Sequence, residues 1–407
     1  MPSQFRASHS LPDLTDTVLD GNLKLVSILG AGSFGKVYKA IDLDSPAENP
    51  IHYAVKCLRL HKLGSKERQR QEQEVRHHKA VSDDPRVVSL VRYFASGDHL
   101  FAVLEYVEKD VLEVLADQEV FHRRPDRVKE AFGDILDGVE SLHRRGIYHR
   151  DIKPDNLLCD SDGKNIRIAD FGLSTKKTRS SLLGCGSPGY MCPESLDRPL
   201  AAGLDSYSPR DNDVWAVAVL FCNFVAGTMP WHKAHFSDSL YNHFLHHKDH
   251  LVQDLGLTEE TNALLRRCFH NNPRKRPTLA EFRTAINAMD RFTVDDPLPS
   301  AIATVVQSEQ PKTSLEPGSS SSRRGDASED EYSTPPTSYI PSSSSQSSPQ
   351  KVPKTGRKVP RRLFKLKKKK NILVPSSEPS SGAPVVRVER RRRSSLQLLA
   401  QNLVLKW

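Results

Sequence analysis

Apolar and polar residues alternate over residues 23–29, the period-two pattern that is typical of strands. Shorter strands are predicted at 37–41, 51–56 and 100–104, the last of which is apolar throughout. Residues 66–81 are rich in Glu, Arg and Gln and are predicted to form a charged helix. The first part of the folded region is therefore expected to be a small, β-rich unit.

From about residue 126, the apolar residues are spaced as in helices. Apolar residues recur at helical spacing in residues 126–143, namely Val128, Phe132, Ile135, Val139 and Leu142. Residues 213–225 are almost continuously apolar, as a surface helix would not be, and are predicted to form a buried central helix. Thr278 and Glu281 form a capping-box pattern for a last helix over residues 279–289. Helices after strands predict an α+β fold.

Periodicity stops beyond about residue 291. Serine runs at 319–322 and 342–345 are interleaved with prolines, and this composition cannot bury a core. Residues 293–407 are therefore predicted to be a disordered Ser/Pro-rich basic tail. Although 407 residues could hold two or three domains, one folded domain over residues 23–292 is expected.

The tail also carries the excess positive charge. The formal net charge is +9, and residues 294–407 hold 20 Lys and Arg against 10 Asp and Glu. The basic composition is therefore no evidence that the folded domain binds nucleic acid specifically. Basic blocks at 357–370 and 390–393 predict an import-receptor signal or a polyanion-binding patch, the alternative being a merely solvated charge run.

Cysteine usage and hydropathy narrow the class of protein. The six cysteines form neither a Cys-x-x-Cys pair nor a small disulfide framework, which favours a reducing compartment. Residues 1–22 are a short N-terminal extension without the apolar core of a signal peptide. No apolar run approaches the roughly 20 residues that a membrane helix needs. A soluble protein with no transmembrane segment is expected, in the cytoplasm and/or nucleus.

The stretch Tyr148-His149-Arg150-Asp151-Ile152-Lys153-Pro154-Asp155-Asn156 combines a carboxylate, an ammonium group and an amide. Phosphoryl transfer can use Asp151 to orient or deprotonate a hydroxyl, Lys153 to offset negative charge, and Asn156 as an oxygen ligand for Mg²⁺. The pattern His-Arg-Asp-x-Lys-Pro-x-Asn resembles the catalytic loop of protein kinases. The resemblance extends over residues of about 23–290 and implies a two-lobed kinase fold, with ATP and Mg²⁺ as cofactors.

A glycine-rich loop follows the first strand. It reads Gly30-Ala31-Gly32-Ser33-Phe34-Gly35, with Val37 two residues later. Glycines allow backbone N–H groups to close over phosphate oxygens. The spacing also occurs in dinucleotide-binding folds, but a strand is expected after this loop where those folds need a helix. An ordinary hairpin turn is the alternative; Val37 favours the kinase interpretation.

The third strand ends in Lys56, and a lysine inside an apolar strand is costly unless it is paired. In protein kinases such a lysine holds the α- and β-phosphates and pairs with a helical glutamate. Glu67, Glu72 and Glu74 are candidates. Glu74 is preferred because it lies one turn before the end of the helix, where the sequence turns apolar, and because its distance to Asp84-Pro85 suits the family. A solvated charged helix is the alternative for these carboxylates.

The resemblance assigns further cofactor-binding positions. It implies contacts to the nucleotide from Ala54, from the hinge residues Leu104, Glu105 and Val107, and from Asp110 near the ribose. Asp170 in Asp170-Phe171-Gly172 comes 14 residues after Asn156 and follows the strand at 166–169. In the family this aspartate is the main Mg²⁺ ligand, and Mg²⁺ prefers hard oxygen donors.

Residues 170–194 resemble an activation segment, with Cys192 in place of the usual alanine of its Ala-Pro-Glu end. Arg150 would receive an activating phosphate there. Leu183 occupies the place of the usual phosphothreonine, so activation by phosphorylation is left open. Possible acceptors are Thr178, Ser180 and Ser181.

Histidines cluster between these motifs and the end of the domain: His232, His235, His243, His246, His247 and His250. Histidine pairs at helical spacing can bind zinc. No cysteine or carboxylate set completes a tetrahedral site in the sequence, and the His-Glu-x-x-His pattern is absent. A solvated surface is therefore expected here.

Lys153 and Ser187 match the serine/threonine form of the family, and residues 184–187 and 229–234 resemble fungal kinases related to a negative regulator of meiosis and to nutrient-response kinases. Protein substrates are implied. Asp110 and Asp155 suggest a preference for arginine three residues before the target, and the tail offers Ser395 as a candidate site. A pseudokinase scaffold is the alternative function, although Lys56, Asp151 and Asp170 are all present.

Overall fold

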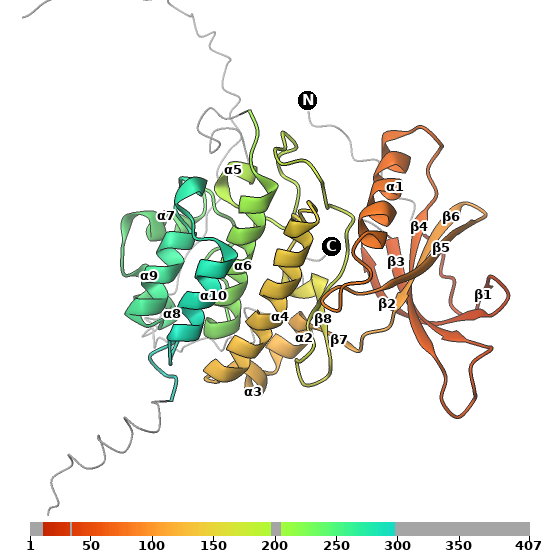
Figure 1. Ribbon diagram of the computed structural model, residues 1–407, viewed down its shortest axis with the longest axis horizontal. Coiled ribbons are helices and arrows are strands. Elements are labelled where there is room, and N and C mark those ends of the chain that lie inside the picture. The colour runs from red at the N-terminus through yellow and green to blue at the C-terminus, as the bar shows by residue number, and fades with distance from the viewer. Residues whose placement is uncertain (1–10, 33–34, 197–204, 298–407) are drawn as a thin grey trace, which may run out of the picture. The chain divides into compact units, whose positions relative to one another are not determined.

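The computed structural model describes residues 11–32, 35–196 and 205–297 (Figure 1). Their first part is a six-stranded antiparallel sheet with the order β1-β2-β3-β4-β6-β5. The strands are β1 (Val18–Leu19), β2 (Leu23–Gly32), β3 (Gly35–Asp42), β4 (His52–Arg59), β5 (Leu90–Ser96) and β6 (His99–Glu105). All four predicted strands are present, and β1 and β5 are additional.

A small apolar core holds this sheet together. Leu25, Tyr38, Val55 and Val103 are buried in it, each contributing about 1.5–3 kcal/mol if fully removed from water. Residues 11–14 also join this lobe, because the Tyr38 hydroxyl donates to the Pro12 carbonyl (3.2 Å) and accepts from the Leu14 N–H (3.2 Å). Part of the N-terminal extension thus packs on the sheet.

Helix α1 (Lys66–Lys79) packs beside the sheet, as the charged pattern predicts. Ser65 caps its N-terminus by accepting from Arg68 N–H. Basic residues fill its last turn, where they face the negative end of the helix dipole.

The second part of the described chain is helical. Its main helices are α4 (Pro125–Arg144), α6 (Pro209–Ala226) and α10 (Leu279–Ala288), and α4 packs against both others (Figure 1). Helix α6 is buried over most of its length, as predicted, but it begins at Pro209 because Ser208 supplies the N-cap. Edge-to-face aromatic pairs such as Phe132–Phe221, 5.0 Å apart, fill the core. The capping box of Thr278 and Glu281 is formed.

Shorter elements complete this lobe. They are α2 (Val111–Ala116), α3 (Gln118–Phe121), α5 (Pro193–Leu196), α7 (Ser239–His246), α8 (His250–Leu255) and α9 (Glu259–Cys268), with the 3-10 turns η1 (Pro154–Asn156) and η2 (Pro273–Lys275). A three-stranded sheet, β7 (Lys109–Asp110), β8 (Leu157–Cys159) and β9 (Arg167–Ile168), has the order β7-β8-β9. The predicted fold class, a β-rich lobe and a helical lobe, is confirmed.

Several predictions concern parts of the chain outside the described residues. These are the disordered tail, its two basic blocks and Ser395, together with Ser33 and Phe34 of the glycine-rich loop. Within the described residues, no helix combines the length and the apolar character needed to span a bilayer.

Candidate active site

The loop at residues 148–156 is positioned by one buried carboxylate. Asp213 of α6 is fully buried and accepts from the backbone N–H groups of His149 (2.9 Å) and Arg150 (2.7 Å). Its Oδ2 also lies 2.9 Å from His143 Nε2. Arg150 has a positive φ of 68°, a conformation that costs roughly 1–3 kcal/mol and persists only where contacts enforce it. The hydrogen bonds between Asp213 and the backbone of His149 and Arg150 hold this conformation.

Asp151 lies at the centre of the loop's polar contacts. Its Oδ1 accepts from the Ser187 N–H at 2.9 Å, and its Oδ2 accepts from Asn156 Nδ2 at 3.0 Å. Lys153 Nζ is 3.7 Å from the same Oδ2. The contact with Ser187 was not foreseen from the sequence, since the two residues lie far apart along the chain. The result is an oriented carboxylate with an ammonium group beside it.

The amide of Asn156 is fixed in one orientation. Its Nδ2 donates to both the Asp151 carbonyl (2.8 Å) and the Asp151 carboxylate (3.0 Å). Because both partners are oxygens, they assign the nitrogen to this side of the amide and turn Oδ1 away from Asp151. An oxygen donor is thereby presented on the far side.

Lys56 is the most tightly held cation of the site. Its Nζ lies 2.7 Å from Glu74 Oε1 and 2.8 Å from Asp170 Oδ1. The ammonium group of this β4 residue therefore contacts both α1 and the Asp-Phe-Gly turn. Burial acts to lower the pKa of Lys56, but the two carboxylates outweigh it and raise that pKa above its ordinary value. Glu72 instead pairs with Arg68 at 2.9 Å. The glutamate that reaches Lys56 is therefore Glu74.

Asp170 is held as a carboxylate in the same cluster. Burial acts to raise its pKa, yet the charge and hydrogen bond of Lys56 hold the pKa well below its usual range. Its φ of 60° is another strained position, and the Gly172 N–H donates to its Oδ1 at 3.1 Å. Strained, partly buried and ionised groups of this kind are typical of functional sites.

Phe171 is buried against two imidazoles. The ring of His78 on α1 is 4.7 Å away and that of His149 in the catalytic loop is 5.3 Å away, measured between centroids. His149 Nε2 lies 3.0 Å from the Ala169 carbonyl. Helix α1, the catalytic loop and the Asp-Phe-Gly turn thus form one packed unit. Neither imidazole contact was predicted from the sequence.

The glycine-rich loop is a β2–β3 hairpin in which Gly32 pairs with Gly35. Gly35 has φ of 140°, and a Cβ there would lie 2.3 Å from the Cys57 carbonyl, so the fold requires this glycine. At Gly30 and Gly32 a Cβ would meet no described atom within 4 Å. Ala31 continues β2, and Val37 pairs with Lys56 across β3 and β4. Gly30 and Gly32 are consistent with close approach of a ligand to the backbone.

The hinge continues β6. Ala54 pairs with Leu104 between β4 and β6, which places these two side chains at matching positions. Glu105 does not project freely, since its carboxylate accepts from the Ser89 N–H (2.9 Å) and pairs with Arg167 (3.1 Å). Val107 follows at half-buried depth. The Glu105 carboxylate is thus engaged by protein groups.

Asp110 has a structural role that the sequence did not indicate. It is the N-cap of α2, and its Oδ1 accepts from the Glu113 N–H at 2.8 Å. It follows the hinge directly, in the place that the resemblance gives it.

The activation segment ends in a buried ion pair. Arg276 contacts Glu194 through two parallel hydrogen bonds of 2.6 and 2.9 Å, and both side chains are almost fully buried. Nearer its start, Arg150 Nε donates to the Leu173 carbonyl at 2.6 Å. Of the three possible phosphate acceptors, Ser180 is buried whereas Thr178 and Ser181 are exposed.

Comparisons with known proteins agree with this geometry. The chain matches the family described as "Protein kinase domain" over residues 23–286. It is 34% identical over 298 residues to the "Negative regulator of sexual conjugation and meiosis" of Schizosaccharomyces pombe, covering 69% of this chain and 63% of that protein. It is 31% identical over 277 residues to the serine/threonine-protein kinase ksp1 of the same species, covering 66% and 57%.

A third relative is the serine/threonine-protein kinase VHS1 of Saccharomyces cerevisiae, 27% identical over 333 residues, with 68% of this chain and 72% of that protein covered. For the first two relatives the chain spans less than two thirds of their length. The matched residues nevertheless include the glycine-rich loop, Lys56, the loop at 148–156 and the Asp-Phe-Gly turn. The chain belongs to the protein kinase family, among its serine/threonine kinases.

Proposed function

We propose that this chain is a catalytically active kinase that transfers the γ-phosphoryl group of ATP to serine or threonine hydroxyls of protein substrates. The observation that carries this proposal is the contact of Lys56 with both Glu74 (2.7 Å) and Asp170 (2.8 Å). Through Lys56, these contacts connect Glu74 on α1 to Asp170 in the Asp-Phe-Gly turn. A scaffold that only binds partners would have no need to retain it.

The donor groups of the site fit Mg²⁺. Asp170 is ionised by the field of Lys56, and the Asn156 amide presents its oxygen away from Asp151, so two hard oxygen donors are present. When bound, Mg²⁺ neutralises charge on the phosphates of ATP. Lys56 would then bind the α- and β-phosphates, and Gly30 to Gly35 would approach the phosphates with backbone N–H groups.

The chain's own residues would orient the acceptor. Asp151 is held by Ser187 N–H and Asn156, so its carboxylate is directed without occupying all of its acceptor positions. It would accept a hydrogen bond from the substrate hydroxyl and take its proton as transfer proceeds. Lys153, 3.7 Å from Asp151, would offset charge on the transferred group.

The decisive test is a transfer assay with purified protein, Mg²⁺ and γ-labelled ATP. We expect labelled phosphoserine or phosphothreonine with the wild type and a loss of at least about 10³-fold with Asp151→Asn, since a positioned base and oriented nucleophile are both lost. The control variant is Asp162→Asn, which alters an exposed aspartate outside the site. Equal incorporation by wild type and Asp151→Asn would overturn the proposal and favour a scaffold.

We also propose a preference for arginine three residues before the target. Asp110 and Asp155 support it as the acidic positions indicated by the resemblance, and Ser395 in Arg392-Arg393-Ser394-Ser395 is a candidate autophosphorylation or pseudosubstrate site. A peptide library should show arginine enrichment that Asp155→Asn reduces. Unchanged phosphate incorporation into the tail after Ser394→Ala with Ser395→Ala would exclude the site.

For the cellular role we propose a fungal growth, nutrient or meiosis-type signalling pathway, acting in the cytoplasm and/or nucleus. The support is similarity to the relative named for sexual conjugation and meiosis. The basic blocks at 357–370 and 390–393 would engage an import receptor or a polyanion. Replacing the basic residues of both blocks by glutamine should remove nuclear accumulation if the import role holds, and leave kinase activity unchanged.

A further inference from the structure

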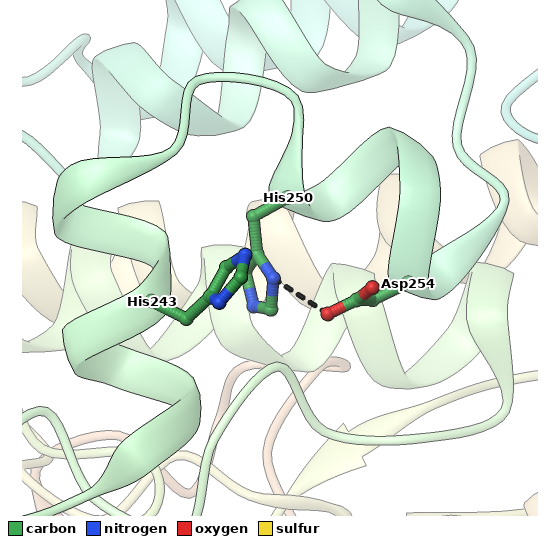
Figure 2. A group of neighbouring side chains, drawn as sticks. All are labelled: His243, His250 and Asp254. Atoms are coloured by element: carbon green, nitrogen blue, oxygen red, sulfur yellow. Dashed lines mark ion pairs between the residues drawn. The ribbon is translucent and has the colours of Figure 1, made fainter.

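Three side chains converge away from the active site, between α7 and α8. His243 lies in the last turn of α7, His250 begins α8, and Asp254 follows one turn later on α8 (Figure 2). One possible ligand atom from each residue lies within 4.8 Å of those of the other two. Asp254 lies four residues after His250 on the same helix, and it supplies the carboxylate that the histidine cluster was expected to lack.

His250 is the fixed member of this group. Its side chain is only 2% exposed, and its Nδ1 points toward Asp254 Oδ2 at 2.7 Å (Figure 2). The contact is too poorly aligned to be a hydrogen bond, so the buried Nδ1 faces the Asp254 carboxylate without a well-formed hydrogen bond to it. A cation between the ring and the carboxylate would use this nitrogen.

The other two members are exposed and adjustable. The ring of His243 lies 4.8 Å from that of His250 between centroids, and the His247 ring stacks on His243 at 4.0 Å. Tetrahedral zinc with ligands at about 2.0–2.1 Å needs donor atoms roughly 3.3 Å apart. Rotation of the exposed His243 and Asp254 side chains about their own bonds can close the remaining distance, while His250 stays in place.

The surrounding helices hold the turn between α7 and α8. Arg266 of α9 donates to the carbonyls of Lys248 (2.6 Å) and Phe244 (3.2 Å). Its positive charge opposes a bound cation, whereas the nearby carboxylates of Asp249 and Asp254 favour one. The backbone of the cluster is therefore prearranged, and the opposing charge limits the affinity.

We propose that His243, His250 and Asp254 form a binding site for a divalent transition metal, with Zn²⁺ as the best match, that links the end of α7 to α8. Two imidazoles and one carboxylate are a ligand set that zinc accepts, with water at a fourth position. Magnesium prefers all-oxygen sites, so it does not compete here. A neutral imidazole keeps a lone pair on one ring nitrogen for the metal.

The test is a zinc titration of the full chain, after treatment with a chelator and in excess Mg²⁺, which occupies oxygen-donor sites. Calorimetry should show one saturable Zn²⁺ site per chain. The exposed-residue variants His243→Ala and Asp254→Asn should each weaken binding at least about tenfold. His246→Ala is the matched control, because His246 is an exposed histidine of α7, like His243, but lies outside the cluster. The zinc affinity of this variant should stay within about twofold of the wild type.

Two further readouts separate the site from general surface binding. Zn²⁺ should raise the melting temperature of the wild type but not of His243→Ala, and Co²⁺ should give the intense visible absorption of a tetrahedral site only in the wild type and the control. Absence of saturable binding by the wild type would overturn the proposal. So would equal zinc affinity in wild type, His243→Ala and Asp254→Asn.

Discussion

His77 Nδ1 on α1 lies 2.9 Å from the Ser174 hydroxyl oxygen, just after the Asp-Phe-Gly turn. Ser174 Oγ in turn donates to the Phe171 carbonyl at 2.7 Å, and Gln73 on α1 donates to the Ser174 carbonyl at 3.0 Å. Through these contacts the last turns of α1 are tied directly to the turn that carries Asp170. The Lys56–Glu74 contact therefore depends on more than the two residues that make it.

Replacing His77 should impair catalysis without unfolding the protein. His77→Ala removes one buried hydrogen bond, worth about 1–2 kcal/mol, and we expect roughly 5–30-fold lower kcat/KM. His77→Asn should recover most of that loss, since an amide can bond the Ser174 hydroxyl. Steady-state kinetics check this, with Glu67→Ala on the exposed face of α1 as control. An Asn variant no better than the Ala variant would contradict this positioning role.

The Arg276–Glu194 pair should be a major contributor to stability. Both side chains are nearly fully buried, so Arg276→Leu leaves Glu194 as an uncompensated buried carboxylate. We expect the free energy of unfolding in urea to fall by about 3–5 kcal/mol. Arg274→Leu changes an exposed arginine of the same turn and should cost less than about 0.5 kcal/mol. Similar losses for the two variants would contradict the prediction.

The glycines of the β2–β3 hairpin should separate folding from nucleotide binding. Gly35→Ala places a Cβ 2.3 Å from the Cys57 carbonyl at a φ of 140°, so we expect at least about 2 kcal/mol of destabilisation. Gly30→Ala meets no described atom and should change stability little, yet weaken ATP binding about tenfold. Urea unfolding and ATP titration measure the two effects. Equal destabilisation by both variants would contradict this assignment of Gly35 to folding and Gly30 to nucleotide binding.

Local motifs allowed much of this site to be predicted from the sequence. Asp151, Lys153 and Asn156 lie within one loop, so their proximity follows from the covalent chain. The pairing of Lys56 with Glu74, rather than with Glu67 or Glu72, was predicted from the position of Glu74 one turn before the apolar end of the helix and from the resemblance. The buried helix α6 was evident because its run of apolar residues suits no surface helix.

The contacts that could not be predicted join segments distant in sequence. Nothing in the pattern around Ser187 indicates that its N–H binds Asp151, and nothing around Ser174 indicates that its hydroxyl meets His77. The cap role of Asp110 is local, but it depends on where α2 begins. Periodicity reports which face of an element is buried but not which element covers it.

His78 should make stability fall with acid. Its Nε2 lies 2.6 Å from the Val88 carbonyl, which can only accept, and burial lowers its pKa to about 4. The unfolded chain, with a pKa near 6.5, binds the proton first, so stability declines as pH falls from about 6.5 toward 4. In His78→Leu the difference in unfolding free energy between pH 7 and 4.5 should be smaller by about 2–3 kcal/mol. His246→Ala should leave that difference unchanged; an equal pH dependence in His78→Leu and wild type would contradict the prediction.

Phosphorylation of the activation segment should spare Ser180. Its backbone exchanges two 2.9 Å hydrogen bonds with Tyr207 and its side chain is buried, so a phosphate there would require this bridge to open. Thr178 and Ser181 are exposed and need no such opening. Mass spectrometry after incubation with ATP should find phosphate at Thr178 or Ser181. Ser180→Ala should retain that phosphate, whereas Thr178→Ala with Ser181→Ala should lose it. Phosphate at Ser180, or a segment that stays unmodified, would contradict this prediction.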